Sequence, residues 1–254
     1  MRRATVALLC ALASCGESQP ASEPSKTARA AVNLENSPTI PPGVIRGRVL
    51  LDGIAPQARP VLLGAADGCG ALRESAPLEK LLVSEGGIAN VLVRVKSGLP
   101  PDARWELPSE VVSLDQQGCV FVPHVIALRA GQALHVRNSD PLVHNVNVRP
   151  SRPRNEASNR SLAPRSADLK LVFDAPETAI ALRCDIHPWM QAYVHVLEHP
   201  HFALTSADGS FEIAGLPPGA YELEVVHEWL GKHLFEARLD GSSGVSASVK
   251  LALP

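Results

Sequence analysis

The sequence predicts an all-β protein built of β-sandwiches, and three observations support this prediction. Among the 254 residues, 22 Pro and 18 Gly break the chain into short segments. The apolar residues between them are mostly Val, Leu, Ala and Ile, and β-branched residues favour strands. Almost no segment shows the spacing of an amphipathic helix. Several short strands separated by turns are therefore the expected architecture.

The expected strands are apolar runs that end at turn signals such as Asp52-Gly53. They occupy residues 44–51, 88–95, 120–128, 133–138, 170–173, 178–183 and 192–197. The stretch 149–167 is polar, contains Pro and carries five Arg, so we expect an exposed loop there.

The N-terminus has the pattern of an export signal. A basic start, MRR, is followed by an apolar run at residues 4–13, which as a helix would span only about 15 Å, too short to cross a bilayer. The run ends in LASC at residues 12–15, which resembles the bacterial lipobox. We therefore expect residues 1–14 to be a lipoprotein signal peptide and Cys15 to be lipidated. An ordinary secretory signal cut at a nearby small residue is the alternative.

This resemblance implies a periplasmic or cell-envelope lipoprotein whose only membrane contact is the N-terminal lipid. Gly16 follows the cysteine, and the lack of Asp there favours the outer membrane. Residues 15–43 are rich in Ser, Pro, Ala and Glu, so we expect a lipid-anchored flexible tether.

The charge balance excludes one class of partner. Removal of residues 1–14 deletes two Arg, leaving 22 basic and 26 acidic side chains and a net charge of -4. Such a chain lacks the basic surface of a nucleic-acid-binding protein.

The C-terminal part contains a second recognisable pattern. Residues 205–223 read TSADGSFEIAGLPPGAYEL, with turns at Asp208-Gly209 and Pro218-Gly219. This resembles the carboxypeptidase regulatory-like (transthyretin-like) β-sandwich over roughly 30 residues. The resemblance implies a scaffold without catalytic groups at 199–254. The usual opening strand of that module resembles residues 44–56, so this strand is a candidate for either module.

The residues that point to chemistry are Cys184, His187 and Met190, preceded about forty residues earlier by His144. A thiolate, two imidazoles and a thioether are the ligand set of a trigonal copper site with a weak axial bond. Cysteine and histidine three residues apart on a tight loop can face one ion, and a histidine from another strand completes the plane. Sulfur suits Cu(I) and imidazole accepts Cu(II), so a rigid cage of this kind suits electron transfer.

The same region resembles a cupredoxin, a plastocyanin-like type 1 copper protein. The similarity runs from about residue 119 to 197 and is in particular to the cupredoxin-like domain of bacterial proteins often labelled methylamine-utilisation proteins. It rests on FVPHVIALRAG at 121–131, NSDPLVHN at 138–145, CDIHPWM at 184–190, and the upstream segments 86–91 and 115–119. The expected fold is thus a Greek-key cupredoxin β-sandwich at 44–198 plus a second, smaller Ig/transthyretin-like β-sandwich at 199–254.

The resemblance implies one mononuclear copper ion held by His144, Cys184, His187 and Met190. Plastocyanin-like loops place Met five residues after His, whereas Met190 is three after His187, so its axial role is the open point. A binuclear centre would need a second loop cysteine, which the loop lacks. A zinc site of the same residues is the alternative, and His124 is a candidate extra ligand or second-shell residue.

The five cysteines can each be assigned. Cys10 leaves with the signal, Cys15 is the lipid anchor and Cys184 is the metal thiolate. Cys69 and Cys119 remain as a disulfide, which an oxidising compartment permits.

These observations predict an electron carrier and not an enzyme. The sequence shows no Ser-His-Asp run, phosphate loop or paired carboxylates, and only the isolated pair His199 and His201 has the spacing of an oxidase motif. We expect electrons to pass at His187 to an unidentified exported redox protein, with no small-molecule substrate. The alternative class is non-redox: copper storage or handling, structural zinc, or a cell-surface scaffold lipoprotein.

Overall fold

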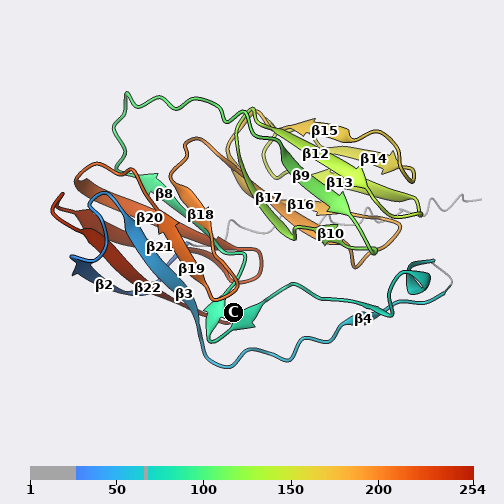
Figure 1. Cartoon of the computed structure of the whole chain (residues 1–254), viewed down its shortest axis with the longest axis horizontal. Helices are drawn as coiled ribbons and strands as arrows, with labels where there is room; N and C mark the ends of the chain where they lie inside the picture. The colour runs from blue at the N-terminus through green and yellow to red at the C-terminus, as the bar shows by residue number, and fades with distance from the viewer. Residues whose placement is uncertain (1–26, 66–67) are drawn as a thin grey trace, which may run out of the picture.

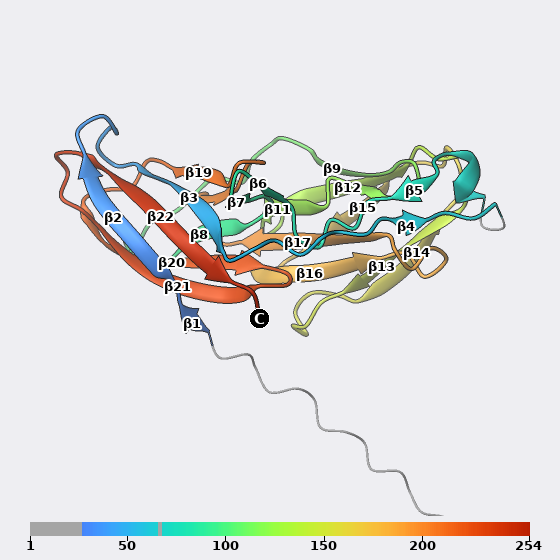
Figure 2. The ribbon, with the colours of Figure 1, turned by 90° about the horizontal axis from the view of Figure 1, so that it is seen from below.

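The computed structural model describes residues 27–65 and 68–254, which form two β-sandwiches (Figure 1). The signal peptide and the lipidation site Cys15, both predicted from the sequence, lie outside the described residues. We call the two units the terminal sandwich, formed by strands within 28–52, 83–97 and 202–252, and the central sandwich, formed by strands within 112–197. The two lie end to end along the long axis of the molecule (Figure 2).

The terminal sandwich contains two sheets. The first has the order β1-β21-β20-β8-β18, and the second has the order β2-β22-β3-β7-β6, with β19 paired to β3. Their bounds are β1 Ala28–Arg29, β2 Ala31–Ser37, β3 Ile45–Asp52, β6 Val83–Ser84, β7 Gly87–Ile88, β8 Leu92–Ser97, β18 Phe202–Leu204, β19 Ser210–Ile213, β20 Gly219–His227, β21 Gly231–Leu239 and β22 Gly244–Ala252.

The central sandwich also contains two sheets, of order β10-β9-β12-β15 and β11-β17-β16-β13-β14. Their bounds are β9 Val112–Gln116, β10 Phe121–Val122, β11 Val125–Arg129, β12 Ala133–Asn138, β13 His144–Arg149, β14 Ser158–Leu162, β15 Leu169–Val172, β16 Glu177–Arg183 and β17 Gln191–Leu197. Parallel pairing joins β12 to β9 and β11 to β17, and the other pairs are antiparallel.

A long excursion, which we call the strap (residues 53–65 and 68–82), connects β3 to β6. It leaves the terminal sandwich, runs along the central sandwich and returns (Figure 1). It contains the paired strands β4 Val61–Leu62 and β5 Ser75–Ala76 and the 3₁₀-helix η1 Cys69–Ala71. Because η1 includes Cys69, the strap reaches the region where the sequence predicts a metal.

From residue 27 onward, the structure differs from the tether expected at 15–43. Strand β1 pairs with β21, and β2 pairs along its whole length with β22. Most of the β2 side chains are exposed, which is why its composition resembles a linker. Backbone hydrogen bonds to a sheet edge, which need no apolar side chains, hold this segment in place.

The division between the two sandwiches also differs from the expected boundary at 198. Strand β3, the candidate for either module, lies between β22 and β7 and pairs with β19, so it belongs to the terminal sandwich. Strand β8, expected in the first module, pairs with β20 of the terminal sandwich as well. The strand expected at 88–95 is interrupted: β7 and β8 lie in opposite sheets of that sandwich, separated by Asn90 with a φ of 63°. Asparagine tolerates this left-handed conformation, which lets the chain cross between the sheets.

The prediction of an exposed loop at 149–167 is wrong in part, because residues 158–162 form β14 at the edge of one sheet of the central sandwich. Most of the β14 side chains are exposed, so the strand carries no apolar pattern that the sequence could reveal.

Each sandwich has its own apolar core. Ile45, Val93 and Val249 are among the fully buried residues of the terminal core, and Leu114, Val136 and Val194 are among those of the central core. A third, small cluster of Leu92, Leu197 and Val226 joins the two sandwiches. Within the described ranges, no helix has the length and hydrophobicity of a membrane span.

Candidate metal centre

Two loops of the central sandwich place the predicted ligands together. His144 begins β13, directly after the turn that leaves β12, while Cys184 and His187 lie in the connection between β16 and β17. Because β13 and β16 are antiparallel neighbours, the end of one lies beside the start of the other. The pairing of these two strands therefore brings together residues that are forty positions apart in the sequence.

The three predicted ligands form a compact buried cluster. Nδ1 of His144 lies 2.9 Å from Nδ1 of His187, and the latter atom lies 3.8 Å from Sγ of Cys184. The three donor atoms lie within 4.8 Å of one another, and the three side chains are buried. Two imidazole nitrogens and one thiol sulfur thus face a common point that water does not reach.

Met190 closes the loop that carries two of these ligands. Its backbone N–H donates to the carbonyl of His187 at 2.9 Å, and its own carbonyl accepts from the Cys184 N–H at 3.2 Å. Its side chain is buried in the same core as Cys184. The spacing of three residues between His187 and Met190 departs from the plastocyanin-like pattern. It gives a tight, hydrogen-bonded loop in which the methionine side chain points inward.

Asn145 fixes this loop from the opposite strand. Its Oδ1 accepts from the N–H groups of Asp185 at 2.8 Å and Ile186 at 3.3 Å, and lies 3.3 Å from Sγ of Cys184. Asn145 is buried. The sequence contains Asn145 within its NSDPLVHN segment, but neither composition nor spacing indicates that its side chain bonds to a loop forty residues away.

Asp140 orients His144. Its Oδ2 lies 2.8 Å from Nε2 of His144, so the Nδ1 of the same ring is left to face His187. Such a carboxylate selects the tautomer of a metal-binding histidine. Burial lowers the pKa of His144 below its ordinary value and outweighs the opposing hydrogen bond and charge of Asp140. The ring is therefore held in the neutral form that metal coordination requires.

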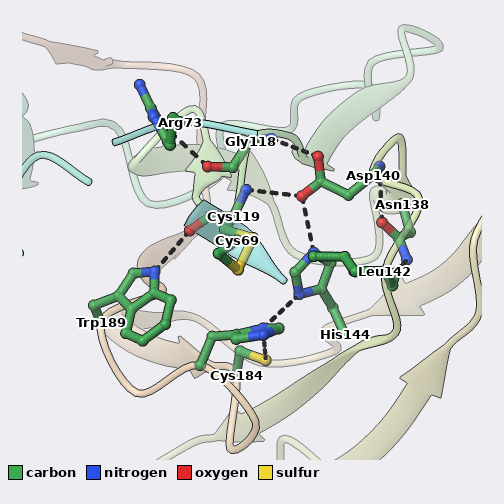
Figure 3. The surroundings of a disulfide bond; sticks show 11 residues. Cys69, Arg73, Gly118, Cys119, Asn138, Asp140, Leu142, His144, Cys184 and Trp189 are labelled. Atoms are coloured by element: carbon green, nitrogen blue, oxygen red, sulfur yellow. Dashed lines mark hydrogen bonds and ion pairs between the residues drawn. A yellow bond between two sulfur atoms is a disulfide. The ribbon is translucent and has the colours of Figure 1, made fainter. Parts of the chain in front are cut away.

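The disulfide predicted between Cys69 and Cys119 is confirmed, and it lies against the metal centre (Figure 3). The two sulfur atoms and a ring nitrogen of His187 lie within 4.8 Å of one another. The N–H of Cys119 donates to Oδ2 of Asp140 at 2.8 Å, the oxygen that also holds His144. Cys119 has a φ of 57°, in the left-handed region of backbone conformation.

Trp189 covers the other side of His187. Its ring centroid lies 5.3 Å from that of His187. Its Nε1 donates to the carbonyl of Cys119 at 2.9 Å (Figure 3). The side chain of His187 is only 2% exposed. The expectation that His187 itself is the point of electron exchange therefore conflicts with its burial.

His124, the candidate extra ligand, lies outside the ligand cluster. Its Nδ1 faces the carbonyl of Gln191 at 3.0 Å and its Nε2 faces the carboxylate of Glu228 at 2.9 Å. Burial lowers the pKa of His124, but the hydrogen bond and charge of Glu228, with the charge of Glu79, outweigh burial and raise it above the ordinary value. His124 thus links the two sandwiches through its contact with Glu228.

The donor set fits copper. Sulfur of Cys184 and the thioether of Met190 are soft donors that suit Cu(I), while neutral imidazoles accept Cu(II). The carboxylate of Asp140 behind His144 is the outer support that such ligands usually have. Zinc accepts the same nitrogen and sulfur donors, so the donor set alone admits both metals.

Comparison with solved structures finds similarity over part of the chain. Amicyanin from Paracoccus versutus is 18% identical, with a TM-score of 0.31, over 41% of this chain and 97% of its own. A copper-containing nitrite reductase from Thermus scotoductus SA-01 is 20% identical, with a TM-score of 0.32, over 41% of this chain and 26% of its own. A purple cupredoxin from Nitrosopumilus maritimus is 16% identical, with a TM-score of 0.28, over 34% of this chain and 99% of its own.

At these identities the similarity concerns the fold alone, and this chain spans about a quarter of the nitrite reductase that it matches. No protein-family model and no curated protein sequence matches the chain.

Proposed function

We propose that this protein is a mononuclear blue-copper electron carrier. The observation that carries the proposal is the buried convergence of His144, Cys184 and His187, with Met190 closing the same loop. Copper bound there would supply one-electron chemistry between its Cu(I) and Cu(II) states. The chain supplies a site that excludes water and changes little between the two states.

The rigidity of the site comes from bonds that do not depend on the metal. Asp140 holds the ring of His144, and Asn145 holds the backbone of the 184–190 loop. The disulfide ties the strap to Cys119, whose backbone binds both Asp140 and Trp189. Ligands fixed in this way need little rearrangement when the charge of the bound ion changes.

The proposed role is electron transfer without catalysis at the metal. Within the described residues, the three groupings of metal-ligating side chains are Cys69-Cys119-His187, His144-Cys184-His187 and Cys119-Asp140-His144. They overlap in one region, which supports one ion rather than a multinuclear cluster. All four candidate ligands are buried, so no ligand side chain opens to solvent for a substrate.

We further propose that electrons pass through Trp189, which is half-buried and lies against His187. The redox partner in this proposal is another exported protein. Export and anchoring through a lipid on Cys15 are supported by the apolar run at 4–13 and the LASC segment at 12–15. The disulfide supports an oxidising compartment.

The experiment is to load the purified chain with copper and to record its visible and electron paramagnetic resonance spectra. The proposal predicts an intense blue thiolate-to-Cu(II) absorption band that disappears reversibly on reduction. Cys184→Ser should abolish the band. The control Cys69→Ser/Cys119→Ser also removes cysteine sulfur near the site, but it should retain a blue absorption band. A colourless, redox-silent protein that binds zinc would refute the proposal, and a band that survives Cys184→Ser would refute the ligand assignment.

A further inference from the structure

A cavity of about 330 Å³ lies beside the metal centre, where three parts of the chain meet. The strap contributes its segment 77–80, and the turn between β20 and β21 contributes Glu228 and Trp229. The central sandwich contributes residues around His124 and the end of the ligand loop. The cavity therefore exists only because the terminal sandwich and the strap are held against the central sandwich.

Aromatic rings dominate the walls of this cavity. Phe121, Trp189, Tyr193 and Trp229 line it, which includes two of the three Trp of the whole chain. Aromatic side chains contribute large flat contact surfaces, and ring pairs prefer stacked or edge-to-face contacts. The walls thus match a flat, apolar molecule.

The polar side chains at the cavity carry both positive and negative charges, which largely balance one another. The carboxylate of Glu228 is 5% exposed and faces His124 at 2.9 Å. Nζ of Lys80 already occupies the face of Trp229, 4.2 Å from the ring centroid. An organic cation would meet Lys80 and His124, and an organic anion would meet Glu79 and Glu228. A neutral occupant therefore fits this cavity better than a charged one.

Some hydrogen-bonding capacity at the walls remains free for an occupant. Glu79 lies 3.7 Å from Nδ1 of His124, beyond hydrogen-bond length, so its oxygens are available as acceptors. The hydroxyl of Tyr193 makes only a 3.5 Å contact with Gln191, whose own amide reaches Pro188 at 3.4 Å. A hydroxyl group, which both donates and accepts, can satisfy such a mixture of donors and acceptors.

The volume sets the size of the occupant. About 330 Å³ is near the lower end of the range for small-molecule sites, roughly 300 to 1,000 Å³. This space holds a compact ring rather than a folded peptide segment.

We propose that this cavity binds a small, neutral, planar aromatic molecule that carries a hydroxyl group, such as a phenol or a hydroquinone. The ring lies among the tryptophans and the hydroxyl faces Glu79. This site goes beyond the proposed copper function, and it adds a small-molecule ligand to a chain for which the sequence predicts no small-molecule substrate. Trp189 and Met190 line the cavity, so a bound ring lies next to the ligand loop.

The test is a titration of the metal-free full chain with hydroquinone, followed by tryptophan fluorescence and by saturation-transfer NMR of the ligand. The proposal predicts saturable one-to-one binding. Cyclohexane-1,4-diol, which keeps the hydroxyls without the flat ring, should bind at least about tenfold more weakly because it cannot stack.

Variants locate the site. Trp229→Ala should weaken hydroquinone binding at least about tenfold, because it removes one aromatic wall. Trp105→Ala is the matched control, because Trp105 packs against His199 and His201 and does not line the cavity. The affinity of this variant for hydroquinone should be unchanged. Glu79→Gln, at a partly exposed position of the strap, should weaken binding about threefold to tenfold without removing a core side chain.

Three outcomes would overturn the proposal: no saturation at millimolar hydroquinone, equal binding of the saturated diol, or unchanged affinity in both Trp229→Ala and Glu79→Gln. If Trp229→Ala does not fold, Glu79→Gln alone decides the location. Because the measurement uses metal-free protein, its result is separate from that of the copper proposal.

Discussion

The indole nitrogen of Trp189 donates a 2.9 Å hydrogen bond to the carbonyl oxygen of Cys119. The amide of the same cysteine donates to Asp140, which holds His144. One residue on the β9–β10 connection is thus bound to the loops that carry both histidines. Its sulfur is bonded to Cys69 of the strap, so the disulfide supports the geometry of the metal centre as well as the fold.

Removing the disulfide with Cys69→Ala/Cys119→Ala should lower the free energy of unfolding by about 4 kcal/mol, the chain-entropy value for a loop of 50 residues. Urea unfolding of the oxidised protein and of the variant measures the difference. Wild-type protein reduced with a dithiol is the control and should show a similar loss. The visible band of the copper-loaded variant should also shift, because Cys119 is freed to move. A loss below about 1 kcal/mol with an unchanged band would contradict this role.

Asp140→Asn should weaken copper binding by about 10- to 100-fold, the usual effect of removing such a support. Oδ2 of Asp140 accepts from the Cys119 N–H and from His144, and Oδ1 accepts from the Gly118 N–H, whereas the amide of asparagine has only one acceptor oxygen. An amide nitrogen facing Nε2 would force the proton of His144 onto Nδ1, the atom that faces His187. Competition titration with a chelator measures the affinity.

Asp168→Asn is the matched control for this substitution, because Asp168 is exposed and lies 3.8 Å from Arg137. It should leave the copper affinity unchanged. Equal affinities for Asp140→Asn and wild type would show that Asp140 does not set the tautomer of His144.

Asn145→Ala should lower the free energy of unfolding by about 2 to 3 kcal/mol, because it leaves two part-buried N–H donors of the 184–190 loop without their acceptor. Asn147→Ala is the control, since Asn147 donates to Asp185 at the surface and should change stability by less than about 1 kcal/mol. Denaturant unfolding of the metal-free proteins tests the comparison. If the two alanine variants lose equal stability, Asn145 does not have the special role that its contacts indicate.

The sequence predicted which side chains meet in the candidate site, because metal chemistry restricts residue type and spacing. Cys184, His187 and His144 could be chosen from their donor atoms and their spacing, and the cysteine count pointed to the disulfide. The residues that hold the candidate ligands in place could not be chosen in this way. Asp140 and Asn145 act through contacts with distant segments, and any Asp or Asn beside a turn has the same appearance in a sequence.

The fold was predictable in class but less so in connectivity. Short apolar runs identified most strands of the central sandwich. Exposed edge strands such as β2 and β14 were not predicted, because backbone pairing, rather than an apolar pattern, holds them in the sheet. The position of the strap was not predicted either. Its path over the central sandwich follows from the bond between Cys69 and Cys119, and a sequence does not give the location of a disulfide in space.

The pair His124 and Glu228 should make the contact between the sandwiches dependent on pH. Glu228 and Glu79 raise the pKa of His124 above its ordinary value near 6.5, against the effect of burial. A raised folded-state pKa means that the pair stabilises the protein fully below about pH 6.5 and that this contribution is lost as pH rises through the folded pKa. His227, whose pKa burial lowers, also lies 3.7 Å from the carboxylate of Glu228.

Glu228→Gln should therefore lower the free energy of unfolding by about 1 to 3 kcal/mol at pH 6 and by less at pH 9, because the charge of His124 is lost as the pH rises through its folded-state pKa. Urea unfolding at the two pH values gives the difference. A double-mutant cycle with His124→Gln separates this pair from His227, since the pH-dependent part should vanish once His124 is absent. An effect of Glu228→Gln that is equal at both pH values, or that persists in the His124→Gln background, would show that the charge of His124 does not hold the two sandwiches together.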